Sequence, residues 1–361
     1  MKKTIALAVA LAALSWGCTR ERVDEYAMVT FMIGDVMKNS AAVQIGDVIQ
    51  EKDVIQTGTD SFCDIKIGQS LIRVKQKTKV VLATLIRQGG MENTAIDLSS
   101  GKMLCKPKKL IKSESFMVKT PTAVAGVRGT QFTVETDSTG TSRIKVFEGS
   151  VKVAKRVKEL EESMPEVLSI APDLNKEEKV VITKEDVDKA EKIVRKIMKS
   201  ESAKGGEAAK EALIKKAGKE LTVSKKNIER FAASDFEKDN REIIDIKPKS
   251  AEVIREISKA VEEEKEEPRP NGRLLITRFE VYFIQNGKVE WQGSLAEEPV
   301  KQGDRIYVAS GEYVFCASVD GPVIWRKQVA NEGKLQIRDR ALVISAQGRE
   351  TRLDLKTGER L

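Results

Sequence analysis

The sequence predicts a mainly β protein in which a charged helical segment separates two β regions. Short runs of alternating apolar and polar residues, broken by glycines, fill residues 29–154 and 269–361. Such alternation is typical of half-buried strands. Residues 155–268, by contrast, are nearly half charged and place their apolar side chains at helical spacing. We therefore expect an N-terminal β-sandwich or roll, a charged α-helical middle segment and a small C-terminal β-sandwich.

The composition argues against an enzyme. Among the 361 residues there is no histidine, and aromatic residues make up only 5%. Catalysis by Ser-His-Asp or Cys-His groups is thereby excluded, as are histidine-ligated metals. We expect no catalytic residues, no metal site and no cofactor.

The first 18 residues predict a secretory signal that ends in a lipid-attachment site. Two lysines precede an apolar run over residues 5–14, which is too short to cross a bilayer as a helix. Gly17 directly before Cys18 resembles a lipobox, after which the new N-terminal cysteine carries acyl chains that hold the protein at a membrane. An ordinary secretory signal with an incidental cysteine is the alternative. Residues 19–28 are expected to form a short charged tether.

Turn residues divide the first part of the N-terminal β region. Glycines recur at positions 34, 46, 58 and 68, and the tetrapeptide Ile-Gly-Asp-Val occurs twice, beginning at Ile33 and at Ile45. Short strands at this spacing favour a sandwich or roll. We expect the nearby aspartates, Asp35, Asp47 and Asp64, to serve turns rather than a metal.

The cysteines of this region leave two alternatives open. Cys63 and Cys105 could form a disulfide if the domain lies outside the cytoplasm. The alternative is two buried, unpaired thiols on strands, which is the commoner arrangement. Cys316 lies far away in the sequence and has no evident partner.

Three short strands separated by turns are expected between residues 116 and 153. Thr120-Pro121 ends the first strand, because proline cannot donate to a ladder. The glycines flanking Val127-Arg128 allow a bend, in which Arg128 either satisfies loop carbonyls or contacts an anionic partner. This stretch, with upstream turn motifs between positions 34 and 61, resembles the hallmark of the FecR domain. The hallmark positions are Thr120, Pro121, Gly126, Val127, Arg128, Gly129, Thr130, Phe132 and Gly149.

The resemblance covers roughly residues 29–153. It implies a mostly β module of bacterial envelopes that binds or signals and has no known catalytic centre. The lipobox-like Gly17-Cys18 followed by a FecR-like domain is an order of segments similar to that of FecR-domain lipoproteins of spirochaetes. That similarity implies an outer-membrane lipoprotein on the periplasmic or surface side, whose FecR-like domain is a binding or scaffolding module.

The charge pattern suggests the kind of partner. The net charge is +8, and residues 73–112 hold ten lysines and arginines against Glu92 and Asp97. Such a basic face could bind an envelope protein, a cell-wall polymer or an anionic glycan or lipid. A solvated outer face of strands is the alternative. We expect no nucleic-acid partner.

The later segments are expected to be structural. Thr183 and Asp186 form a capping box before an amphipathic run, but no heptad repeat is sustained, so a long coiled coil is not supported. From Arg273 onward the period returns to two. Trp291 and Trp325 are expected to fill a core there rather than to stack against a sugar.

Two further functions are weighed against the lipid-anchored scaffold. The namesake of the FecR family relays iron-citrate transport status to a sigma factor, but no 18-residue apolar run precedes this domain. Signalling would therefore act through a partner. A glycan hydrolase using two carboxylates would rely on Glu135 and Glu148, which is a weak signal without a cleft.

Overall fold

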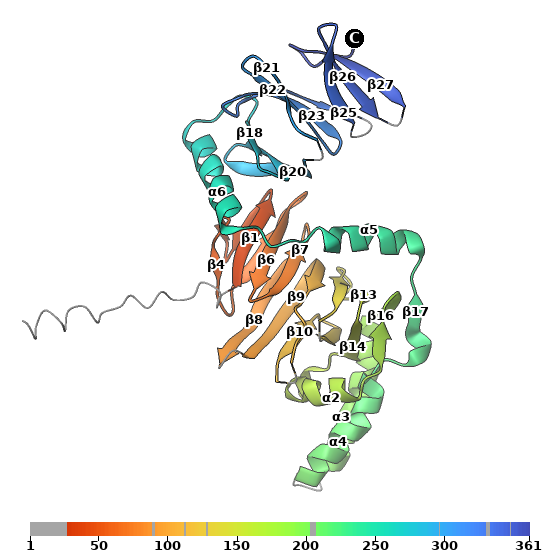
Figure 1. The fold of residues 1–361 in the computed structure, drawn as a ribbon. Coiled ribbons are helices and arrows are strands. Elements are labelled where there is room, and N and C mark those ends of the chain that lie inside the picture. Colours follow the sequence, from red (N-terminus) through yellow and green to blue (C-terminus); the bar gives the residue numbers. More distant parts are fainter. Residues whose placement is uncertain are drawn as a thin grey trace, which may run out of the picture.

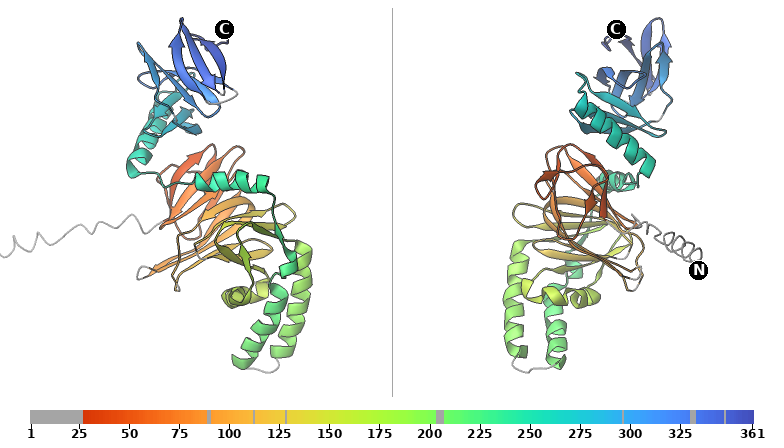
Figure 2. Two further views of the ribbon diagram at one scale, coloured as in Figure 1. Left: turned by 45° about the vertical axis from the view of Figure 1, so that its right-hand side comes forward. Right: turned by 90° about the vertical axis from the view of Figure 1, so that its left-hand side faces the viewer.

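The computed structural model describes residues 27–88, 91–111, 113–127, 129–202, 207–295, 297–329, 333–346 and 348–361. Two large sheets form an N-terminal body, three small sheets form a C-terminal body, and helices lie beside and between them (Figure 1). The molecule is elongated, with the C-terminal sheets at one end and a pair of helices at the other (Figure 2). The predicted fold class, mainly β with a helical insert, is confirmed.

The first large sheet runs through the chain in a nearly sequential order. All of its neighbouring strands are antiparallel. In order across the sheet, its strands are β4 (Val48–Ile49), β1 (Ala27–Ile33), β6 (Phe62–Ile67), β7 (Ser70–Val74), the end of β9 (Met91–Lys106), β12 (Gln131–Thr136), β13 (Ser142–Glu148), β16 (Glu178–Ile182) and β17 (Ile228–Arg230).

The second large sheet packs against the first. Its only parallel pair among the described residues is β9 with β10. In order, its strands are β3 (Ala41–Ala42), β2 (Val36–Lys38), β5 (Val54–Thr57), β8 (Lys79–Gln88), the start of β9, β10 (Ser115–Lys119), β11 (Ala123–Val127), β14 (Ser150–Lys155) and β15 (Asp173–Asn175).

Strand β9 belongs to both sheets because it bends at Gly101. Before the bend it pairs with β8 and β10, and after it with β7 and β12. Gly101 has a φ of +93°, and an added Cβ would lie 2.6 Å from the Cα of Thr78. Only glycine tolerates both the left-handed backbone and this close approach. The space between the two sheets is filled by one apolar core that includes the fully buried Phe116 and Phe132.

The charged middle segment is mainly helical, as predicted, but it also contributes short strands that the sequence did not predict. Strands β15, β16 and β17 extend both sheets. The predicted capping box is present: the Thr183 hydroxyl accepts from the Asp186 amide, and the Asp186 carboxylate accepts from the Thr183 amide. The helices are η3 (Lys158–Ser163), α2 (Met164–Ile170), α3 (Lys184–Ser202), α4 (Glu207–Leu221), η4 (Lys225–Asn227), α5 (Ala233–Ile244) and α6 (Ala251–Glu266).

The C-terminal body stacks three antiparallel sheets rather than two. Alternate residues of β23 face opposite cores: Val314 and Cys316 point to one, Phe315 and Ala317 to the other. The middle sheet is therefore buried on both faces. The sheets are β18 (Arg273–Ile276), β19 (Glu280–Gln285) and β20 (Lys288–Ser294); β21 (Val300–Gln302), β22 (Arg305–Ser310), β23 (Tyr313–Ser318) and β24 (Val323–Gln328); and β25 (Lys334–Arg338), β26 (Ala341–Ala346) and β27 (Arg349–Asp354).

Candidate functional site

The hallmark stretch builds the interior of the N-terminal body. A buried network joins three hydroxyls: Ser142 Oγ lies 2.6 Å from the Oγ1 atoms of both Thr120 and Thr122. The Arg156 guanidinium donates to the carbonyl oxygen of Thr120 at 3.1 Å, a contact that sequence reasoning missed. These hydroxyls have no base beside them among the described residues, so the network ties β10, β11 and β13 together and supplies no nucleophile.

The hallmark glycines mark close approaches of backbone. Gly129 has a φ of +74°, and a Cβ there would lie 2.7 Å from the Cα of Lys109. At Gly126 a Cβ would lie 3.0 Å from Leu168, so the glycine lets α2 pack on the second sheet. Gly149 has a φ of +79° and adjoins Thr130, whose hydroxyl donates to the carbonyl of Ser150.

The remaining hallmark positions divide between buried and exposed. Val127 and Phe132 are buried, whereas Pro121 is exposed at the turn between β10 and β11. Arg128 and Cys18, the positions expected to contact a partner and to carry lipid, both lie outside the described residues. The predicted roles of these two residues stay predictions.

Of the two alternatives for Cys63 and Cys105, the structure has the unpaired thiols and not the disulfide. Both thiols are free and buried. Strand β7 lies between β6, which carries Cys63, and β9, which carries Cys105. Two strand spacings amount to about 9.6 Å, beyond the roughly 7 Å that a disulfide can bridge.

The two carboxylates considered for hydrolysis do not face each other. Glu135 lies opposite Arg143, while Glu148 lies opposite Gln131 at the other end of β12 and β13. Four residues of strand separate the two positions by roughly 13 Å, more than the 5–9.5 Å found between glycosidase carboxyls. Glu148 also accepts a hydrogen bond from Gln131. These acids do not form a catalytic pair.

Two other residue assignments from the sequence differ in outcome. Asp47 does serve a turn, because its carboxylate accepts from the Gln44 amide. Asp64 does not: it is buried on β6 and forms a bidentate ion pair with Arg73, at 2.6 and 2.7 Å. In the C-terminal body, Trp325 is buried and Trp291 packs against Tyr313 and Phe315, so both fill cores as expected.

An interdomain joint connects the two β bodies. Its apolar part brings Phe31 of β1 against Tyr282 of β19, with ring centroids 5.7 Å apart. The Lys249 ammonium lies 5.0 Å and 5.6 Å from these two rings and pairs with Glu280, and the lysine side chain is only 9% exposed. A cation held between two rings and a carboxylate is a specific contact. The joint is therefore more than a flexible linker.

The repeated Ile-Gly-Asp-Val turns form the polar part of the joint. In the first, the Gly34 amide donates to the carbonyl of Val289, and Asp35 pairs with Lys288. In the second, the Ile45 carbonyl accepts from Ser258 of α6 at 3.4 Å. The repeat thus supplies two matching turns, one for β20 and one for α6.

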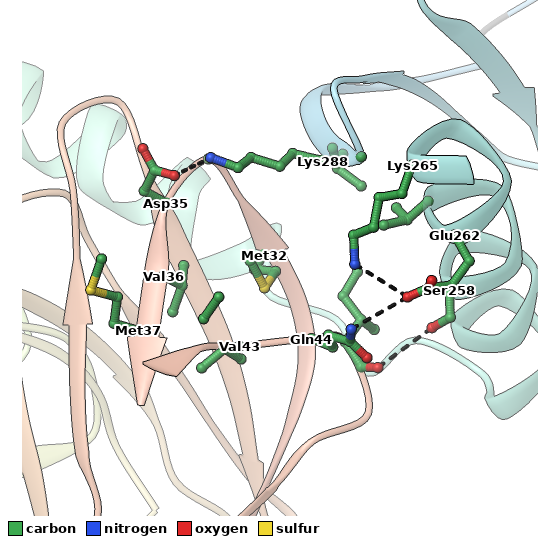
Figure 3. Close-up of a pocket in the computed structure, with 16 residues that line it drawn as sticks. Met32, Asp35, Val36, Met37, Val43, Gln44, Ser258, Glu262, Lys265 and Lys288 are labelled. Atoms are coloured by element: carbon green, nitrogen blue, oxygen red, sulfur yellow. Dashed lines mark hydrogen bonds and ion pairs between the residues drawn. The ribbon is translucent and has the colours of Figure 1, made fainter. Parts of the chain in front are cut away.

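A pocket of about 270 Å³ opens between these two turns (Figure 3). Its rim is polar: Lys288 reaches Asp35 on one side, while Gln44 and Lys265 both donate to Glu262 on the other. Its walls are apolar and include Met32, Val36, Met37, Val43, Ile45 and Val261. The pocket can accommodate an apolar group.

Lysines of the predicted basic face, residues 73–112, form ion pairs with an acidic helix. Helix α5 crosses the outer face of the first sheet (Figure 1). Its Asp239 pairs with Lys102 at 2.6 Å and Lys145 at 3.4 Å, and its Glu242 pairs with Lys75 at 2.8 Å. Part of the expected basic face is thus already occupied within the chain.

Two further features are absent from the part of the chain that the structure describes. No helix among them is long and apolar enough to cross a membrane. No group of three or more Cys, Asp or Glu side chains among them is arranged to hold a metal ion.

Comparison with known proteins identifies the central region. The family model described as FecR protein matches residues 53–152, from the start of β5 into β14. The chain therefore contains a FecR domain. The preceding strands, β1 to β4, lie in the same two sheets but outside the match.

Two crystal structures of a candidate anti-sigma factor from Parabacteroides distasonis ATCC 8503 are similar to part of the chain. Each is 14% identical over 36% of this chain and 54% of that one, with TM-scores of 0.29 and 0.28. The similar part thus spans about half the length of that protein. No curated protein sequence matches the chain.

Proposed function

We propose that this chain is a non-enzymatic FecR-type protein of the bacterial cell envelope that relays a signal by binding a protein partner. The observation that carries the proposal is the FecR match over residues 53–152. Membership of this domain in the FecR family implies a binding or signalling module rather than an enzyme. The absence of histidine and the separation of Glu135 from Glu148 support the same reading.

The proposal is tested by capturing the partner in the source bacterium. Cells producing the tagged full chain are treated with a chemical crosslinker, and the captured proteins are quantified against cells producing an unrelated tagged envelope protein. We expect a small set of envelope proteins enriched at least tenfold. Equal recovery from both strains would contradict a relay through a protein partner.

A lipid-anchored scaffold is the second candidate, and the sequence of residues 1–18 favours it. Acyl chains on Cys18 would hold the two β bodies at a membrane without any catalytic turnover. Detergent phase partitioning tests the anchor: the wild type should enter the detergent phase, and Cys18→Ala should stay in the aqueous phase. Aqueous wild type would exclude the anchor and leave the relay intact.

A further inference from the structure

The outer face of the first sheet carries a basic stripe with an apolar centre. Neighbouring positions across β7, β9, β12 and β13 are set by their register, in which Arg73 lies beside Leu104, Leu104 beside Thr133 and Thr133 beside Lys145. Lys75 and Lys102 lie two residues along the chain from Arg73 and Leu104. The stripe thus combines several cations with buried apolar side chains, of which Leu71, Leu104 and Phe147 are the largest.

Helix α5 covers this face with a narrow stripe of its own. Phe236, Asp239, Ile243 and the following Ile246 recur at helical spacing and point to the sheet. The ring centroids of Phe236 and Phe147 lie 5.4 Å apart, and Ile243 is fully buried. Ile244, on another side of the helix, is half exposed. The helix is thus held to the sheet by an apolar stripe that is interrupted by the buried carboxylate of Asp239.

The face of α5 and the face of the sheet are complementary in charge. Asp239 is 7% exposed and shared between Lys102 and Lys145, while Glu242 reaches Lys75. Burial lowers the pKa of Arg73. The hydrogen bond to Asp64 and the negative charges of Asp64, Glu242 and Asp245 outweigh this effect and raise the pKa. Removing α5 would leave several partly desolvated cations around an apolar patch.

The contacts of α5 with the sheet are made by side chains. The helix has 12 residues, too few to be stable alone in water. Residues 246–250 lead from it to α6 without forming a helix or strand. The sheet beneath is complete without α5, because every strand there pairs with its neighbours. A helix held by side chains over a complete sheet can be replaced by another of the same pattern.

We propose that this face is a docking surface for an acidic amphipathic helix of a partner protein, and that α5 occupies it until that helix displaces it. The inference rests on the proposed function, since it names the surface and the kind of partner that function requires. The partner helix carries apolar residues at positions i and i+7 with a carboxylate at i+3, as α5 does. Binding is electrostatic in part and falls as salt rises.

A synthetic peptide of residues 232–247 serves as the probe of the surface. Its binding to the purified full chain is measured by fluorescence anisotropy for the wild type and for Asp239→Lys/Glu242→Lys, which turns three ion pairs into repulsive contacts. The internal helix competes at high effective concentration in the wild type. We expect the variant to bind the peptide at least tenfold more tightly, and 0.5 M salt to reverse most of that gain.

Two controls sharpen the measurement. Glu166→Lys/Asp188→Lys changes the net charge equally at exposed acids away from α5 and should bind like the wild type. A peptide carrying Asp239→Lys/Glu242→Lys should not bind any of the chains. Should the double variant fail to fold, Glu242→Lys alone reverses only the more exposed pair and should shift binding in the same direction.

The proposal is overturned if the opened chain binds the peptide no more tightly than the wild type, or if the charge-reversed peptide binds equally well. Because only purified chain and peptide are used, this outcome does not touch the capture of a partner from cells. Conversely, failed capture would remove the relay and leave the peptide result standing.

Discussion

At the scale of single residues, Lys249 contacts both sides of the interdomain joint. It joins Phe31 of one body to Tyr282 and Glu280 of the other. Lys249→Met leaves Glu280 without its cation, so we expect the free energy of unfolding to fall by about 2 kcal/mol. Lys288→Met, which removes an exposed pair with Asp35, should cost about 0.5 kcal/mol. Urea unfolding of both variants checks this, and equal effects would contradict it.

The same joint is expected to weaken in acid. Burial opposes ionisation of Glu280, but hydrogen bonds from Lys249 and Tyr282 outweigh it and lower the pKa of the carboxyl. A lowered folded-state pKa gives stability that is present above the unfolded value of about 4.3 and lost as pH falls through the folded value. Urea midpoints should therefore drop below about pH 4.3 in the wild type, and less steeply in Glu280→Gln. Parallel curves would show that Glu280 does not contribute.

The buried thiols should be inert in the folded protein. Burial raises the pKa of Cys105, and burial together with the Asp64 charge raises that of Cys63. A thiol-reactive dye should label neither residue in the native chain and both after unfolding without a reductant. Labelling in the native state would contradict the burial, and no labelling after unfolding would show a disulfide.

At the scale of elements, the bend in β9 explains how one strand serves two sheets. Gly101 and Gly46 have nearly the same φ, +93° and +95°, but nothing lies within 4 Å of a Cβ added at Gly46. Gly101→Ala should therefore cost about 3 kcal/mol through strain and clash with Thr78, and Gly46→Ala about 1 kcal/mol through strain alone. Thermal unfolding of the two variants separates the contributions, and equal losses would mean that the bend tolerates a side chain.

The short strands of the charged middle segment are the elements hardest to predict. The period-two run of β10 is clear in the sequence because burial alternates along the strand, whereas β19 is a continuous apolar run with four buried residues in succession. Strand β15 has three residues and β17 has three, and both are set among charged residues. Their pairing comes from partners far along the chain, which local patterning does not contain.

The hallmark residues were easy to locate and hard to interpret. Thr120 and Gly129 carry the family resemblance because the fold needs a buried hydroxyl and a left-handed turn there. The basic residues at 75, 102 and 145 could be read as a basic face, but Asp239 and Glu242, which cover them, lie about a hundred residues or more further along the chain.

At the scale of the whole molecule, α5 and α6 link the sheet face to the joint. Helix α6 contacts both β bodies, through Ser258 to Ile45 and through Ile257 to the apolar cluster around Tyr282. Lys249 lies between the two helices. The sequence indicates two β regions but does not place them relative to each other, because the contacts of the joint connect residues more than two hundred positions apart.

The central claim is that a partner protein binds the basic face of the FecR domain, and site-specific photo-crosslinking in living cells tests it most directly. A photoreactive residue at Val181, beside Arg143 on that face and 38% exposed, is compared with one at Ile193 on α3, which is 40% exposed. We expect a discrete protein adduct from Val181 and none from Ile193. The yield of the Val181 adduct should increase in Asp239→Lys/Glu242→Lys. Adducts of equal yield from both positions, or none from either, would contradict it.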